Sequence, residues 1–138
     1  MTLLERFRQQ PPQKHLDPAV RLAYVNEIAL EDRDTIAAMA REDEDPKVRR
    51  AAVGKLMDPA VLGVIAREDR DETVQGSAVS MLRDIALEAF EGLGESDSLA
   101  AVEVLADPKV LTLVAQAVAT ASALVLVVVG WPRGNGDD

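Results

Sequence analysis

The residues of this chain that could do acid–base or metal chemistry are mostly carboxylates, and two short acidic segments stand out. They are residues 42–45, Glu-Asp-Glu-Asp, and residues 69–72, Asp-Arg-Asp-Glu. Neither segment has the glycine and the distal glutamate of an EF-hand loop. Solvated turns and helix caps are therefore the favoured interpretation, with weak divalent-cation binding as the alternative.

Other catalytic groups are scarce. The chain has one histidine, His15, and no cysteine. A structural or catalytic zinc site draws mainly on several His and Cys ligands, and a phosphate site of the P-loop type needs a glycine-rich loop, which is absent. We expect His15 to be a packing residue of an N-terminal connector. The sequence predicts no enzyme, and no catalytic residue, metal or cofactor.

Composition narrows the choice of partner. The 138 residues carry a net charge of −9, and 48% of them are hydrophobic but only 3% aromatic. This acidity repels phosphate backbones and disfavours nucleic acid as the main partner. The N-terminal residues contain no long apolar run of the kind that marks a secretory signal, so we expect a cytoplasmic protein. The expected partner is another protein.

Helix-start signals organise the chain. Aspartate can cap the free N–H groups of a first helical turn, and proline fits the first helical position because no N–H is needed there. An Asp-Pro pair occurs four times, and Asp71 opens a related segment without proline. The caps predicted on this basis are Asp17, Asp45, Asp58, Asp71 and Asp107.

The sequence also repeats. A shift of 26 residues places Thr35–Leu56 on Val61–Leu82, and partial copies cover residues 17–28 and 105–111. A fixed short period is typical of a solenoid, in which each unit buries its apolar face against its neighbours. The predicted units are pairs of short antiparallel helices. First helices are expected at Asp34–Arg41 and Pro59–Ala66, and second helices at Pro18–Ile28, Pro46–Leu56 and Asp71 to about Gly92. A further helix is expected at Leu99–Leu105.

The second helices carry the pattern Asp-x-x-Val-Arg-x-x-Ala-Val-x-x-Leu, seen from Asp45 to Leu56. This pattern resembles a HEAT-like repeat of the compact bacterial variety, over roughly residues 17–116. A similar arrangement is found in the N-terminal repeat region of large, poorly characterised bacterial proteins. The resemblance implies an all-α, right-handed HEAT-like solenoid. We expect a capping helix and connector at 1–16, the solenoid at 17–130 and a disordered tail at 131–138.

Charged pairs recur on the second helices. Asp17 precedes Arg21 by four residues, as Asp45 precedes Arg49, which predicts a structural Asp–Arg ladder along these helices. Asp71 meets Gln75 instead, so the ladder should weaken there. A row of ligand-facing arginines is the alternative.

The expected function is non-catalytic protein binding or scaffolding, through the surface of the stacked second helices. Arg49, Arg50 and Gln75 are the candidate partner-binding residues, although a ladder that uses Arg49 would leave Arg50 as the free cation. Arginine is favoured at interfaces because its planar fork pairs with carboxylates. The alternative is a HEAT-like DNA glycosylase or another nucleic-acid-binding protein, which the acidic charge disfavours.

The C-terminal segment departs from the pattern. No charged residue occurs from Val110 to Trp131, a length that could span a membrane. We expect a helix from Pro108 to about Gln116 and an atypical final helix over Ala119–Gly130 that covers the last unit. A membrane-tethered adaptor, anchored through residues 110–131, and a degraded terminus are the alternatives. The oligomeric state stays open.

Overall fold

The computed structural model describes residues 11–87 and 93–129, except for the side chains of Ala117 and of residues 120–129. The fold is all-α, and no strand occurs in the described ranges. A short 3-10 helix, η1, covers Pro12–Lys14. The α-helices are α2 (Pro18–Glu27), α3 (Arg33–Glu42), α4 (Pro46–Val53), α5 (Pro59–Glu68), α6 (Glu72–Ala86), α7 (Glu95–Leu105) and α8 (Pro108–Val129).

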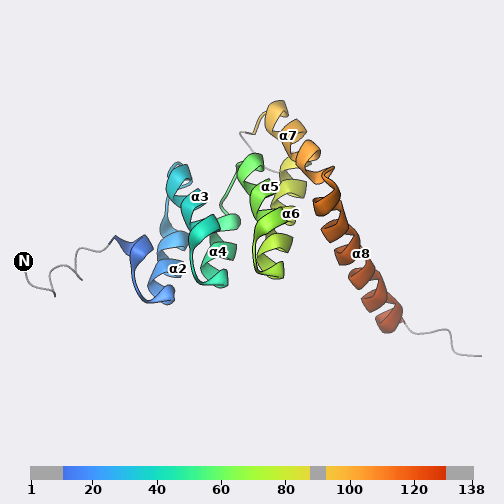
Figure 1. Ribbon diagram of the computed structural model, residues 1–138, viewed down its shortest axis with the longest axis horizontal. Helices are drawn as coiled ribbons and strands as arrows, with labels where there is room; N and C mark the ends of the chain where they lie inside the picture. Colours follow the sequence, from blue (N-terminus) through green and yellow to red (C-terminus); the bar gives the residue numbers. More distant parts are fainter. Residues whose placement is uncertain (1–10, 88–92, 130–138) are drawn as a thin grey trace, which may run out of the picture.

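The helices form two rows. In one row α2 contacts α4, α4 contacts α6, and α6 contacts α8, while in the other α3 contacts α5 and α5 contacts α7. Helix pairs α3–α4 and α5–α6 join the rows through extensive contacts. Figure 1 shows helices α2 to α6 standing side by side along the long axis of the molecule, with α8 running obliquely away from them. The three helices predicted as second helices, α2, α4 and α6, therefore lie beside one another in one row.

Aspartate caps explain where the helices begin. The Oδ1 atoms of Asp17, Asp45 and Asp58 accept the N–H groups two residues later, at 2.8, 2.7 and 2.9 Å. Asp71 does the same for α6 at 2.8 Å, and Asp107 for α8 at 2.9 Å. Each carboxylate satisfies a backbone donor that has no partner within its helix.

Small apolar side chains build the core between the rows. Five alanines have no exposed surface, and valine, leucine and isoleucine supply most of the rest. Because alanine has so little volume, the helices can approach closely. At Gly63 helix α5 approaches α7 closely, since a Cβ there would lie 2.8 Å from Val104 Cγ1. The buried alanines are Ala40, Ala52, Ala66, Ala78 and Ala101.

Several predicted boundaries were wrong. Helix α4 ends at Val53 and not at Leu56, and Gly54 is its C-cap. Helix α7 begins four residues earlier than expected, at Glu95, with Gly94 as its N-cap. Helix α6 ends at Ala86, with Leu87 as its C-cap, and the rest of the extension predicted for this helix falls on residues 88–92, which lie outside the described residues. Residues 1–10 of the predicted capping helix and connector, and the predicted tail at 131–138, also lie outside them.

The C-terminal segment is one helix, whereas two were expected. Helix α8 runs from Pro108 to Val129, because no proline, glycine or aspartate interrupts this stretch. Its first turn packs into the core through Val110, which is fully buried. The C-terminal part of α8 extends away from the other helices (Figure 1). Within the described residues, no helix combines the length and the apolar character needed to cross a membrane.

Candidate functional site

A buried ion pair joins α4 to the turn that precedes α6. Arg49 Nε lies 2.9 Å from Asp69 Oδ2, and Arg49 Nη2 lies 3.0 Å from Asp69 Oδ1. The two side chains are only 2% and 5% exposed. Arg49 Nη1 also donates to the carbonyl oxygens of Asp43 and Glu44. The guanidinium therefore links three chain segments by charge-assisted hydrogen bonds, which are the strong ones.

The same arrangement occurs one unit earlier. Arg21 Nε lies 2.8 Å from Asp43 Oδ2, and Arg21 Nη2 lies 3.0 Å from Asp43 Oδ1. Arg21 Nη1 donates to the carbonyl oxygens of His15 and Leu16, as Arg49 does to those of Asp43 and Glu44. The hydrogen bond to Asp43 raises the pKa of the Arg21 guanidinium above its ordinary value. We call these two pairs, Arg21–Asp43 and Arg49–Asp69, the rungs.

The predicted ladder named the wrong carboxylates. Asp17 and Asp45 use their side chains to cap their own helices, so neither pairs with the arginine four residues later. The arginines reach instead to Asp43 and Asp69, each in the turn of the following unit. These aspartates recur at the 26-residue shift, two positions before a cap, and that recurrence was the signal available in the sequence.

The rungs stop at both ends of the described repeats. His15 takes the position of Asp43, and its Nδ1 accepts the N–H of Asp17 at 3.0 Å, as Asp43 Oδ1 accepts the N–H of Asp45 at 2.9 Å. His15 is thus a half-buried connector residue with a structural hydrogen bond. Gln75 takes the position of Arg49, without a charge to form a third rung.

The prediction that Arg49 binds a partner was wrong, because Arg49 is buried in a rung and a partner cannot contact its side chain. Arg50 is exposed, and Gln75 is half-buried. Arg50 belongs to a set of residues on one side of three neighbouring helices, all of them exposed except Leu22, which is half-buried and packs against the core. We call this set the second-helix face. It comprises Ala19, Leu22 and Asn26 of α2, Lys47 and Arg50 of α4 with the adjoining Gly54, and Thr73, Gly76, Ser80 and Arg83 of α6.

The second-helix face is made of small residues and cations. Lys47 and Arg50 are exposed, and neither forms an ion pair with another residue in the described part of the chain. Arg83 lies 3.0 Å from Asp84 and remains 62% exposed. A Cβ at Gly76 would meet nothing within 4 Å, so open space adjoins α6 there. This face is therefore accessible and locally positive on an acidic protein.

An apolar groove borders this face, and sequence reasoning missed it. It has a volume of about 480 Å³ and lies between α6 and α8. We call it the α6–α8 groove. Leu111 and Val118 on its wall are 50% and 59% exposed. Their spacing with Val114 on one helical face was the signal in the sequence. The groove is lined by Gly76, Val79, Ser80, Arg83, Leu105, Leu111, Leu113, Val114 and Val118.

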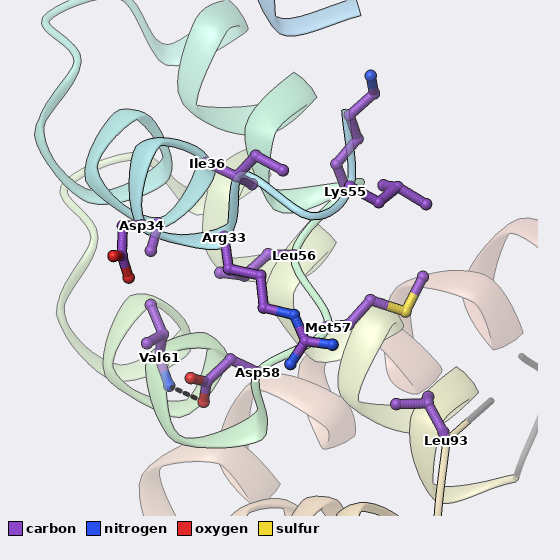
Figure 2. Close-up of a pocket in the computed structure, with 11 residues that line it drawn as sticks. Arg33, Asp34, Ile36, Lys55, Leu56, Met57, Asp58, Val61 and Leu93 are labelled. Carbon is purple, nitrogen blue, oxygen red and sulfur yellow. Dashed lines mark hydrogen bonds between the residues drawn. The ribbon is translucent and has the colours of Figure 1, made fainter. Parts of the chain in front are cut away.

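A second pocket, of about 290 Å³, lies where α3 and α5 begin. Figure 2 shows Arg33 extending toward Asp58 and Met57, with Lys55 pointing away. Asp58 Oδ1 accepts the N–H of Val61 at 3.2 Å, and Lys55 Nζ donates to two carbonyl oxygens of the preceding unit. Two charged residues of this pocket thus already have structural partners: Asp58 caps α5, and Lys55 binds backbone carbonyl oxygens.

Comparisons and a search for metal ligands give no further assignment. No family model, no curated protein and no solved structure matches the chain. In residues 11–87 and 93–129, no group of three His, Asp or Glu side chains is placed to hold a metal ion.

Proposed function

We propose that this chain is a HEAT-like helical-repeat solenoid that acts as a non-catalytic protein-binding or scaffolding module. Its binding surface is the second-helix face. The observation that supports this most is the repeated rung, which ties each second helix to the next unit through a buried arginine. A solenoid held in this way presents an extended surface rather than a deep pocket.

The rungs matter for binding because they fix the register of α2, α4 and α6. Arg21 and Arg49 each contact their own unit and the following one, so successive helices cannot slide without breaking two hydrogen bonds to a carboxylate. A pre-ordered surface loses little conformational entropy when a partner binds. The second-helix face is therefore suited to recognition by shape and charge.

The chemistry of the face supports a protein partner. Arg50 is an exposed arginine amid small residues, with Gly54 and Gly76 nearby in the same register. Arginine combines a planar hydrogen-bonding fork with an apolar stem, which is why it is enriched at interface centres. The small neighbours leave room for an incoming chain.

Site-specific photo-crosslinking tests this proposal. A crosslinking amino acid replaces Lys47 or Ser80 on the second-helix face, or Glu68 at the end of α5 as the matched control, and all three positions are exposed. We expect Lys47 and Ser80 variants to capture the same protein in the native host, and the Glu68 variant to capture none of it. Capture from Glu68 alone, or no specific capture from Lys47 and Ser80, would overturn the proposal.

A further inference from the structure

The α6–α8 groove has the form of a helix-binding groove. Its walls are two helices, and its α8 wall presents Leu111, Val114 and Val118 at the spacing of one helical stripe. Val79 and Leu105 add apolar surface from α6 and the end of α7. An apolar groove between helices is the kind of surface into which an amphipathic helix places its apolar face.

The α6 wall leaves space for a helix backbone. Gly76 has no side chain, and a Cβ there would meet no atom within 4 Å. Ser80, one turn further along α6, is small and exposed. A helix packed beside these residues could approach α6 closely, since small side chains permit short interaxial distances.

Charge identifies the kind of helix. Of the residues that line the groove, Arg83 is the charged one, and no carboxylate lines it. Arg50 occupies the position on α4 that corresponds to Gly76 on α6, and Lys47 lies one turn before Arg50. Arg83 is ion-paired with Asp84 but stays 62% exposed, whereas Lys47 and Arg50 form no ion pair among the described residues, so the unpaired charges at these positions are positive. Interactions beyond about 8 Å are largely screened at physiological salt, so these local charges count for more than the net charge of the chain.

We infer that the α6–α8 groove binds an amphipathic helix of a partner protein, one that carries carboxylates beside its apolar stripe. The apolar stripe fills the groove, and the carboxylates face Arg50 and Arg83. This inference rests on the proposed function and specifies the chemistry of the partner. A second copy of the chain and a lipid surface are the other possible occupants, and the experiment below separates them.

The test is selection from a displayed library of helical peptides with randomised surface positions, using the full chain as bait. We expect enriched peptides to share an apolar stripe flanked by Asp or Glu. Their dissociation constants should rise about tenfold for Arg50→Glu, through charge repulsion, and for Gly76→Leu, through filling of the open space. Arg33→Glu is the matched control, because it makes the same charge change on an exposed arginine of α3, and it should leave binding unchanged.

Other results would overturn the inference. These are selection of Lys- or Arg-rich peptides, no enrichment, or affinities unaffected by Arg50→Glu and Gly76→Leu in variants whose circular dichroism shows intact folding. Sedimentation showing a dimer that Val118→Asp dissociates would assign the groove to a second copy instead. Flotation with phosphatidylcholine vesicles that Val118→Asp abolishes would assign it to lipid. If crosslinking from Lys47 and Ser80 still captures a protein, the proposed function stands and only the partner chemistry fails.

Discussion

Arg49 and Asp69 are separated by 20 residues in the sequence, and their side chains form a two-pronged ion pair at 2.9 and 3.0 Å. The pair is almost completely buried. Two opposite charges can be buried away from water when they pair with each other and their remaining hydrogen-bonding groups also find partners. Here Arg49 Nη1 donates to the backbone carbonyl oxygens of Asp43 and Glu44. Removing one member leaves the other charged and unpaired away from water.

The first prediction concerns this rung. Asp69→Ala should lower the free energy of unfolding by about 3 to 5 kcal/mol, the usual cost of breaking one side of a buried ion pair. Urea denaturation measures it. Arg50→Ala is the control, since an exposed arginine without an ion pair among the described residues should change stability by less than about 0.5 kcal/mol. Similar small effects for both variants would show that the rung does not stabilise the fold.

The second prediction concerns a helix cap. Asp45 Oδ1 accepts the N–H of Lys47 at 2.7 Å, and no ion pair uses this carboxylate in the described structure. Asp45→Ala should therefore cost about 1 kcal/mol, and Asp45→Asn much less, because asparagine keeps the accepting oxygen. Thermal melts of the two variants test this. Equal melting temperatures for Asp45→Ala and the parent would contradict the assignment of the cap.

The third prediction concerns pH. The hydroxyl of Thr73 and its N–H donate to Asp71, and these bonds lower the pKa of the Asp71 carboxyl below 3.8. A depressed pKa in the folded state stabilises the protein above the ordinary pKa, and that stability is lost as the pH falls through the folded value. Thr73→Ala removes the hydrogen bond from the threonine hydroxyl and should raise the pKa of Asp71 toward 3.8.

The carboxyl-carbon NMR shift of Asp71, followed from pH 6 to pH 2, measures this change. The carboxyl of Asp58 provides an internal control, because it caps α5 without a threonine hydroxyl. An unchanged Asp71 titration in Thr73→Ala would mean that the hydroxyl contributes nothing to the shift.

The fourth prediction contrasts two glycines. Gly76→Ala should raise stability by about 0.5 to 1 kcal/mol, because alanine favours the helix and its Cβ would enter open space. Gly63→Ala should instead lower stability, since its Cβ would lie 2.8 Å from Val104 Cγ1 at the contact of α5 with α7. Guanidinium denaturation of both variants tests the contrast. Stabilisation by both would mean that α5 and α7 are not closely packed at Gly63.

The sequence was most informative about helix starts. Each predicted cap lies at the start of a helix. In four of the five a proline follows the aspartate, and such a pair specifies its local geometry without reference to the rest of the chain. Helix ends were less predictable. Leu56 keeps the apolar spacing of α4 but lies beyond its last helical residue, so the pattern marks which residues are buried and not where the helix stops.

The candidate site was only partly predictable, for a physical reason. Arg49 and Arg50 are neighbours in the sequence, yet one is buried and the other exposed, because successive helical residues point about 100° apart. The carboxylate that pairs with Arg49 comes from the next unit, and such a partner follows from packing rather than from spacing. The groove likewise depends on the angle between α6 and α8, which the sequence does not encode locally.

The measurement that tests the central claim most directly is the affinity of the crosslinked partner for two charge-reversed proteins. One carries Arg50→Glu on the second-helix face, and the other, the turn variant, carries Glu42→Lys and Glu68→Lys at the ends of α3 and α5, where the acidic turns begin; all three positions are exposed. We predict that Arg50→Glu weakens binding by about tenfold, or roughly 1.4 kcal/mol, and that the turn variant binds as the parent does. Loss of binding in the turn variant, with Arg50→Glu unaffected, would contradict the account.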